Sequence, residues 1–330
     1  MRTLQGRVVV VTGASSGVGR AVARAFGAAG ARVALIARGV EALTQAGREI
    51  EAAGGEALVL PLDVSDPQAV EQAADAVVQR WGGIDVWVND AMVSVLSPAL
   101  QLRPEELQRV TEVNYLGSVY GTLAAVRRMR ARGGVVLQIG SALAYRSIPL
   151  QSAYCASKAA LRAFTDSLRS ELLHDRIPVR LCMVHLPAVN TPQFDVMRNR
   201  LPNAPQPVPP LFQPEEVARV VLYAALHPRR ELWLGWSTIG AIVGQFFVPG
   251  LIDRYLARWG YSGQQAPTPA REPRRDNLER PLPGDRGAHG RFDRQSRRFS
   301  SEMRLRVHPW LAGALAGTAV AAMGARAWRR

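Results

Sequence analysis

A tyrosine and a lysine four residues apart have the types and spacing that most clearly indicate chemistry in this chain. Lys158 is the only lysine among the 330 residues, whereas arginine is abundant. It follows Tyr154 at a spacing that places both side chains on one face of a helix. An ammonium near a phenol favours the phenolate and lowers a pKa that is ordinarily about 10. The pair therefore predicts that Tyr154 is a general acid/base whose pKa is shifted toward neutrality.

The same spacing also describes two side chains that merely share a solvated helix face, so the prediction depends on the rest of the chain. A glycine-rich turn, Gly13–Gly19, lies between an apolar run at residues 8–12 and a helical pattern that begins near its end. Glycines let the backbone turn tightly and approach a pyrophosphate at a helix N-terminus. The GxxxGxG spacing differs from the GxGxxG fingerprint, so the turn alone supports a dinucleotide only in outline.

Short β-branched runs alternate with longer helical stretches from residue 7 to about residue 236. This alternation predicts an α/β fold, a doubly wound Rossmann-like parallel sheet with helices on both faces. The expected strands are residues 8–12, 33–37, 58–62, 86–89, 135–140 and 179–185.

The chain beyond residue 200 is less regular. A proline-rich stretch at residues 201–210 predicts either a surface loop or a lid over a substrate site. The uncharged run at residues 232–252 has the length of a membrane span, but it contains Gln245 and Pro249. Because it follows the helical segment 214–226, we interpret it as the last strand of the sheet and an apolar segment near the substrate or an interface.

Composition divides the chain into three parts, with residues 1–261 as the expected Rossmann-fold domain. Residues 262–306 are rich in Pro, Arg, Gly and Ser and predict a disordered linker. Residues 307–330 contain an uncharged Ala/Gly-rich run, 310–325, which as a helix reaches about 24 Å and falls short of a hydrocarbon core of roughly 30 Å. A tail anchor, a helix packed on protein and an unfolded end are the alternatives for this part.

Charge and cysteine content limit the other functional classes. The formal net charge is +14, and much of it comes from residues 261–330, where 14 arginines face six acidic residues. No recognisable nucleic-acid-binding module accompanies these arginines, so we expect no nucleic-acid partner; attraction to anionic lipid would use the same charge more simply. Two cysteines and five scattered histidines predict neither a disulfide framework nor a metal site. The first apolar run leads straight into the glycine turn without a signal-peptide pattern, so we expect a cytoplasmic domain, with membrane association through the C-terminus as an added expectation.

Five motifs in order resemble the short-chain dehydrogenase/reductase family, in its single-domain branch. TGxxxGxG is followed by Asn114, Ser141, Tyr154 and Lys158, and the resemblance covers about residues 4–260. It implies that Tyr154 exchanges a proton with a substrate oxygen, and that Lys158 holds the nicotinamide ribose and depresses the pKa of Tyr154. It also implies that Ser141 polarises the substrate oxygen and that Asn114 anchors a proton-relay water.

The resemblance also implies a cofactor site and its preference. Family members that prefer NAD carry an acid, usually at the position of Ala37, to hold the ribose 2′-OH; here Ala37 is followed by Arg38. An arginine suits a 2′-phosphate, so we expect NADP rather than NAD, with a plain surface role for Arg38 as the alternative. Asp63 matches the adenine contact, and Val189 and Thr191 match the nicotinamide amide contacts. The full set is Gly13, Ser15, Ser16, Gly17, Val18, Gly19, Arg38, Asp63, Val64, Asn89, Ala91, Tyr154, Lys158, Val189 and Thr191.

Three features depart from the family pattern. Met92, in Asn89-Asp90-Ala91-Met92, stands where a glycine usually lets the adenosine ribose pass closely. Pro187 stiffens a turn that usually contains glycine after the sixth strand. Residues 261–330 have no counterpart in the minimal fold, so the resemblance says nothing about them.

The sequence therefore predicts an NADP-dependent oxidoreductase that interconverts a secondary alcohol and a ketone. Apolar residues near the expected mouth, Leu211, Phe212, Phe246 and Phe247, favour an apolar substrate. By analogy with the family, we expect a homodimer or homotetramer. The alternative from a different class is a catalytically degenerate scaffold that keeps the cofactor fold and attaches to a membrane or partner through its tail. Met92 favours the scaffold, whereas the intact acid/base residues argue against it.

Overall fold

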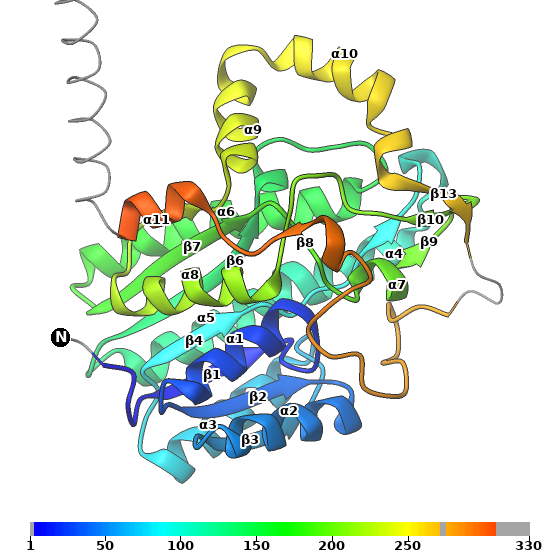
Figure 1. The fold of residues 1–330 in the computed structure, drawn as a ribbon. Coiled ribbons are helices and arrows are strands. Elements are labelled where there is room, and N and C mark those ends of the chain that lie inside the picture. The colour runs from blue at the N-terminus through cyan, green and yellow to red at the C-terminus, as the bar shows by residue number, and fades with distance from the viewer. Residues whose placement is uncertain (1–2, 271–274, 308–330) are drawn as a thin grey trace, which may run out of the picture.

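The computed structural model describes residues 3–270 and 275–307, and a seven-stranded parallel sheet forms its centre (Figure 1). The strand order is β12-β7-β6-β4-β1-β2-β3, and every pairing in this sheet is parallel. Chain order reverses between β1 and β4, which creates a crevice at the carboxyl ends of the strands. The prediction of a doubly wound parallel sheet is confirmed. The strands are β1 (Val8–Thr12), β2 (Arg32–Ala37), β3 (Glu56–Pro61), β4 (Val86–Asn89), β6 (Gly134–Ser141), β7 (Val179–Leu186) and β12 (Glu231–Trp233).

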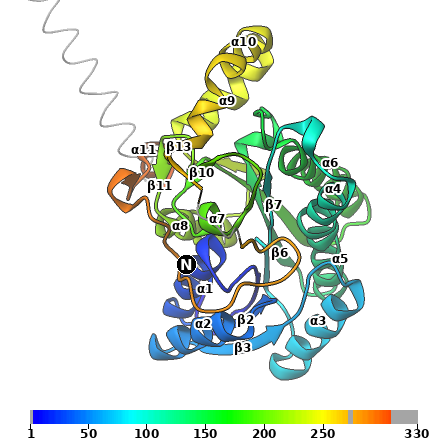
Figure 2. The ribbon, with the colours of Figure 1, turned by 90° about the vertical axis from the view of Figure 1, so that its right-hand side faces the viewer.

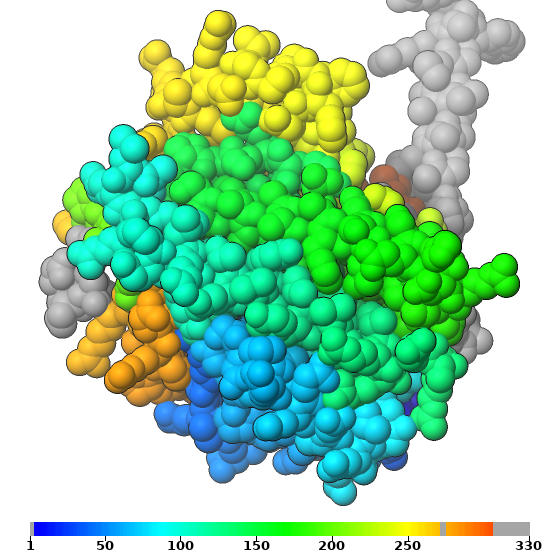
Figure 3. All heavy atoms as spheres, turned by 180° about the vertical axis from the view of Figure 1, so that it is seen from behind, coloured from blue at the N-terminus to red at the C-terminus, as the bar shows by residue number. Residues whose placement is uncertain are grey.

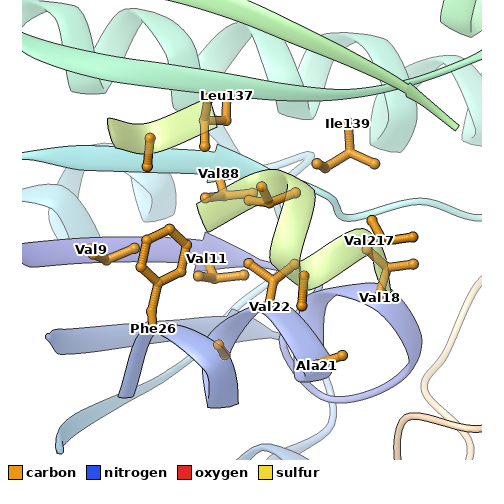
Figure 4. Close-up of a cluster of buried hydrophobic side chains, with 14 of the residues drawn as sticks. Val9, Val11, Val18, Ala21, Val22, Phe26, Val88, Leu137, Ile139 and Val217 are labelled. Carbon is orange, nitrogen blue, oxygen red and sulfur yellow. The ribbon is translucent and has the colours of Figure 1, made fainter. Parts of the chain in front are cut away.

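Side chains alternate between the two faces of the sheet, so each strand supplies two cores. On β1, Val9 and Val11 pack with α1 (Gly17–Ala28), α2 (Val40–Ala52) and α8 (Pro214–Leu226), whereas Val8 and Val10 belong to the opposite core. Figure 4 shows Val9 and Val11 beside Phe26 of α1 in the first core. The second core is covered by α3 (Pro67–Trp81), α4 (Pro104–Thr111), α5 (Gly117–Met129) and α6 (Ser152–His174).

Small strand pairs build up the carboxyl end of the sheet. The proline-rich stretch contributes β10 (Asn203–Pro205), which pairs with β13 (Gln265–Pro269), so this stretch is anchored by a strand as well as being a loop. The other short elements are β5 (Val95–Leu96), β8 (Ala188–Val189), α7 (Gln193–Val196), β9 (Arg198–Asn199), β11 (Leu211–Phe212), β14 (Ser296–Arg297) and α11 (Ser301–Val307).

The apolar run at residues 232–252 forms the end of the sheet and two projecting helices, α9 (Trp236–Phe247) and α10 (Pro249–Trp259). These helices stand above the rest of the molecule in Figures 1 and 3. No residue of α10 is buried, and Phe247 on α9 is 79% exposed. The predicted last strand is confirmed as β12, whereas a role of the apolar segment at the substrate or an interface stays a prediction. Within residues 3–270 and 275–307, no helix combines the length and hydropathy needed to cross a bilayer.

Residues 276–293, which we call the strap, lie along the carboxyl end of the sheet (orange in Figures 1 and 2). This placement differs from the disordered linker that the composition of residues 262–306 predicts. Leu278, Ala288 and Phe292 are buried in the body, and the polar groups of the strap bond with arginines and backbone of the domain. Contacts distant in sequence thus offset the low apolar content. The tail-anchor prediction for residues 307–330 concerns residues that, apart from Val307, lie outside the described part.

Candidate active site

A cavity of about 670 Å³ lies at the carboxyl end of the sheet, between the strand ends and the strap. This size and position are typical of a site for a small molecule in a doubly wound fold. Most residues predicted from the sequence line it: Gly13, Ser15, Ser16, Gly17, Val18, Arg38, Asp63, Val64, Ala91, Ser141, Tyr154, Lys158, Val189 and Thr191. Gly19, Asn89 and Asn114 do not line it.

The glycine-rich turn has a geometry that only glycine allows. Gly13 has a φ of +73°, and a Cβ there would lie 2.9 Å from the backbone of Ala91. At Gly19 a Cβ would lie 2.4 Å from the carbonyl oxygen of Gly13, so this glycine packs the helix against the turn rather than facing the cavity. Ser16, the residue before α1, makes no side-chain capping bond, so no side chain covers the backbone N–H groups at this helix N-terminus. The first of them, that of Gly17, donates to the carbonyl oxygen of Gly287 in the strap. The turn therefore fits a pyrophosphate group.

Tyr154 and Lys158 lie one turn apart on α6, and both face the cavity, as the spacing predicts. The Lys158 side chain is buried, and its Nζ donates a hydrogen bond of 2.7 Å to the carbonyl oxygen of Ile139 on β6. The same nitrogen lies 5.8 Å from the centre of the Tyr154 ring. The ammonium is thus held beside the phenol by the neighbouring strand.

The pKa of Tyr154 differs from the prediction. Burial raises the pKa of this phenol well above its ordinary value, and a hydrogen bond with Ser141 lowers it only in part. Asp90, which follows β4, lies near Lys158; burial raises the pKa of Asp90 and lowers that of Lys158, while their mutual attraction opposes both shifts. Because the carboxylate of Asp90 also acts on Tyr154, it offsets the stabilisation of phenolate that a lone ammonium would supply.

Ser141 ends β6, and a buried polar network holds its backbone. Its Oγ accepts a 3.1 Å hydrogen bond from the backbone N–H of Leu143, and its carbonyl oxygen lies 3.0 Å from Nδ1 of His185. The other ring nitrogen of His185 is 3.4 Å from Glu231, which also accepts a 2.8 Å bond from the Tyr145 hydroxyl. Burial alone would raise the pKa of Glu231, but the neighbouring His185 and hydrogen bonds from Trp233 and Tyr145 lower it to about 2. A fully charged carboxylate thus lies behind the wall that carries Ser141.

Two predicted asparagines support the site from behind its wall. Asn114 lies in a π-helical turn, Glu112–Leu116, between α4 and α5; it accepts a 2.8 Å bond from the N–H of Val93 and donates a 3.2 Å bond to Ser157. Asn89 is buried at the end of β4 and bonds to Thr122 and Gln138. Internal bonds thus hold the Asn89 side chain, and the cofactor contact expected of Asn89 and the water-anchoring role expected of Asn114 stay predictions.

The residues expected at the adenosine end contact other parts of the chain. Arg38 donates three hydrogen bonds to strap carbonyl oxygens: Nη2 to Asn277 at 2.5 Å, and Nη1 to Leu278 and Glu279 at 3.1 Å each. Asp63 forms an ion pair with Arg109 of α4. Both side chains nevertheless line the cavity.

The departures from the family pattern do not close the cavity, because Met92 and Pro187 both lie in its wall.

The apolar residues that the sequence predicts at the mouth of the cavity lie elsewhere. Leu211 and Phe212 are buried, and Phe246 and Phe247 are exposed on α9; none of the four lines the cavity. Its apolar lining comes instead from Val93, Leu143, Ile148, Phe194, Met197 and Trp259.

Sequence reasoning missed Asp90 as a partner of Lys158, and it missed His185, Glu231 and the strap. Asp90 could have been predicted as a site residue, because it follows a central strand and ligands bind at the carboxyl ends of such strands. His185 stands at the end of an apolar strand run and carries no distinguishing motif.

Comparison with known proteins agrees with this geometry. The family model described as short chain dehydrogenase matches residues 7–201. The uncharacterized oxidoreductase YxnA of Bacillus subtilis (strain 168) is 34% identical over 82% of this chain and 77% of its own. The fatty acyl-CoA reductase of Acinetobacter baylyi is 32% identical over 69% of this chain and 76% of its own. Among solved structures, an alcohol dehydrogenase of Thermococcus sibiricus, complexed with 5-hydroxy-NADP, superposes with a TM-score of 0.61 and 30% identity, covering 70% of this chain and 96% of that one.

Proposed function

Because this chain belongs to the short-chain dehydrogenase family of NAD(P)-dependent oxidoreductases, we propose that it interconverts a secondary alcohol and a ketone with Tyr154 as the acid/base. The main support is that Ser141, Tyr154 and Lys158 face one cavity whose other end is the glycine-rich turn. A scaffold without chemistry has no need for these three side chains on a shared wall.

Each residue has a distinct task in this mechanism. In reduction, Tyr154 donates its phenolic proton to the carbonyl oxygen of the substrate, while Ser141 donates a hydrogen bond to the same oxygen. The ammonium of Lys158 then stabilises the phenolate that remains. A bound nicotinamide cofactor supplies the hydride. Because burial raises the pKa of Tyr154, the phenol carries its proton at neutral pH and can act as the acid in reduction.

We propose NADP(H) rather than NAD(H) as the cofactor. Arg38 stands at the carboxyl end of β2 and lines the cavity, and its neighbour Ala37 carries no acid that would select a ribose 2′-OH. The Thermococcus sibiricus relative, solved with 5-hydroxy-NADP, supports this preference.

The substrate proposed for this site is apolar. The cavity walls near Tyr154 include Ile148, Phe194 and Trp259, and the lining offers few charged groups apart from those at the cofactor end. The Acinetobacter baylyi relative is named for a reaction on a fatty acyl-CoA, which agrees with a long apolar substrate.

Binding and turnover of the purified full chain test this proposal. We expect NADPH to raise the midpoint of thermal unfolding more than NADH does, and Arg38→Ala to abolish the difference. Reduction of apolar ketones should fall about 10²- to 10⁴-fold in Tyr154→Phe. That variant should keep the thermal shift with NADPH, because the substitution removes only a hydroxyl. Full activity in Tyr154→Phe, or no shift with either nucleotide, would contradict the proposal.

Assembly and location are proposals of the same kind. We propose a cytoplasmic homodimer or homotetramer that associates with membranes through residues 307–330. Fractionation of cells that express the chain with and without residues 308–330 tests the membrane part: full-length protein found only in the soluble fraction would contradict it.

A further inference from the structure

The strap extends along the cavity. It passes from the carboxyl end of β2, past the glycine-rich turn, to the carboxyl end of β7. Asn277, Pro281, Leu282, Gly284 and Arg286 of the strap line the same cavity as the turn and the acid/base residues. The matched part of the short chain dehydrogenase family model ends at residue 201, so the strap is an addition to what the family model describes. Figure 2 shows the strap crossing in front of the sheet, beside α1.

The first anchor of the strap lies at the expected adenosine end. Leu278 is completely buried in the core that α3 and α5 cover. Its carbonyl oxygen accepts hydrogen bonds of 3.1 Å from both Arg38 and Arg109. Asp276 pairs with Arg198 at 3.0 Å. Two arginines at the end of the cavity therefore hold the backbone of the strap.

The middle of the strap contacts the glycine-rich turn directly. The N–H of Gly17 donates a 3.1 Å hydrogen bond to the carbonyl oxygen of Gly287. Arg20, one turn further along α1, is 1% exposed and forms ion pairs with Glu49 and Asp285. Burial alone would raise the pKa of Asp285, but hydrogen bonds from Arg20 and from the N–H of Gly287 hold it below the ordinary value. A buried arginine of the turn-helix unit thus fixes the strap over the turn.

The second anchor lies beside the segment that follows β7. The N–H of Phe292 donates a 3.0 Å bond to the side chain of Asn190, whose Nδ2 donates a 2.8 Å bond to Asp293. The Phe292 ring packs edge-to-face on Phe194, with centroids 5.9 Å apart. Gly290 approaches so closely that a Cβ there would lie 2.3 Å from the carbonyl oxygen of Thr191. The strap is therefore fastened at both ends and at its middle.

We propose that the strap is an additional wall of the cofactor-binding site, so that the dinucleotide is bound between the glycine-rich turn and the strap, and enters and leaves only when the strap opens. This inference rests on the proposed cofactor binding. The cavity has a size typical of ligand sites with the strap in place. Strap carbonyl oxygens bond the N–H of Gly17 and the guanidinium of Arg38, so the dinucleotide replaces these contacts when it binds under the strap. Exposed Arg286 faces this space from the strap side, and its guanidinium suits the phosphates of a dinucleotide.

Limited trypsin digestion of the full chain tests whether the strap closes over the cofactor. Trypsin cleaves after arginine unless proline follows, and Arg286 and Arg291 are exposed on the strap. We expect saturating NADPH to slow cleavage after both residues at least fivefold. Cleavage after Arg130, at the end of α5, serves as the internal control and should not change. Faster strap cleavage with NADPH would mean that the cofactor displaces the strap, and it would overturn the proposal.

Cofactor exchange rates supply the second test. In Asp285→Asn, Arg20 keeps its ion pair with Glu49 but loses the ion pair with the strap. We therefore expect the dissociation and association rates of NADPH to rise together, by about tenfold for dissociation. Asp75→Asn is the matched control, because Asp75 pairs with Arg128 on the far helices α3 and α5. Equal rates in Asp285→Asn, Asp75→Asn and the unchanged protein would overturn the proposal.

Failure of this inference and failure of cofactor binding give different results. If the protein binds no dinucleotide, NADPH changes neither the thermal unfolding midpoint nor any cleavage rate. If it binds NADPH but the strap is not a wall, the midpoint rises while strap cleavage and exchange rates stay as they are in the controls.

Discussion

The α9–α10 segment, residues 236–259, and the strap lie close together in the sequence. The apolar α9–α10 segment is largely exposed, whereas the polar strap has buried side chains. Residues 236–259 contain a long uncharged apolar run, but Leu251 is 62% exposed. The strap is rich in arginine, proline and glycine, but Leu278 is completely buried. Hydropathy alone therefore does not determine which segment packs on the domain, because the hydrogen-bonding partners that the domain surface offers to the segment also count.

The domain supplies hydrogen-bond donors for the carbonyl and carboxylate oxygens of the strap. Arg20, Arg38 and Arg109 donate to the carbonyl and carboxylate oxygens of the strap. The α9–α10 segment has far fewer such bonds, one of which joins Arg146 to Asp253 at 2.5 Å. A polar segment with several fixed partners can therefore pack more closely than an apolar segment with few.

Removal of the buried leucine should separate the two segments most strongly. Leu278→Ala should lower the free energy of unfolding by about 3 kcal/mol, because it leaves a cavity in a closed core. Leu251→Ala on α10 should change it by less than about 0.5 kcal/mol. Urea denaturation of the full chain measures both values. Similar losses for the two variants would show that the strap does not depend on this anchor.

Replacement of the buried arginine should have the next largest effect. Arg20→Met should lower the free energy of unfolding by about 1 to 2 kcal/mol, since Glu49 and Asp285 lose their common partner but keep some contact with water. Arg254→Met on exposed α10 should leave stability within about 0.5 kcal/mol. The same denaturation experiment applies, and a stable Arg20→Met protein would mean that the ion pairs add little to docking of the strap.

Docking of the strap should also depend on pH, whereas α10 should not. The pKa of Asp285 is lowered when folded, so its contribution is present above the unfolded value of about 3.9 and is lost as the pH falls through the folded pKa. His289 behaves oppositely: burial alone would lower its pKa, but Glu215 and Asp293 raise it. Its contribution is complete below about 6.5 and is lost as the pH rises through the folded pKa.

Hydrogen exchange of the strap, corrected for intrinsic exchange rates, measures this dependence. We expect the strongest protection between about pH 4 and 6.5, with a modest decline on either side because His289 is partly exposed. His289→Asn should remove the decline on the alkaline side only. Protection that stays the same from about pH 6.5 to 8 would argue against the His289 contact, and protection that stays the same below about pH 4 would argue against the Asp285 contact.

The smallest effect on stability is expected at the exposed aromatic rings of α9. Phe246→Ser combined with Phe247→Ser should change the free energy of unfolding by less than about 0.5 kcal/mol. The same change should reduce self-association at high concentration, because it removes a contiguous apolar surface. Light scattering across a concentration series checks this expectation. A large loss of stability would show that α9 is packed more firmly than its exposure indicates.

The strands and most of the cavity lining could be predicted from the sequence because their signals are local. A run such as Val8–Thr12 carries its own pattern, and the acid/base pair lies within five residues. The strap could not be predicted, because Arg20 and Asp285 are separated by 265 positions and neither segment indicates the other. The shifted pKa of Tyr154 could not be predicted for the same reason: burial and Asp90 come from distant parts of the chain.

The single lysine also allows the opening of the candidate active site to be followed by chemical modification. Apart from the N-terminal amine, Lys158 carries the only primary amino group in the chain. Reagents that acylate amines can therefore modify only one side chain, and that side chain lies in the candidate active site. Because it is buried and bonded to Ile139, its rate of modification measures how often the cavity opens to solvent. Mass spectrometry of one acyl group would follow that opening without any engineered label.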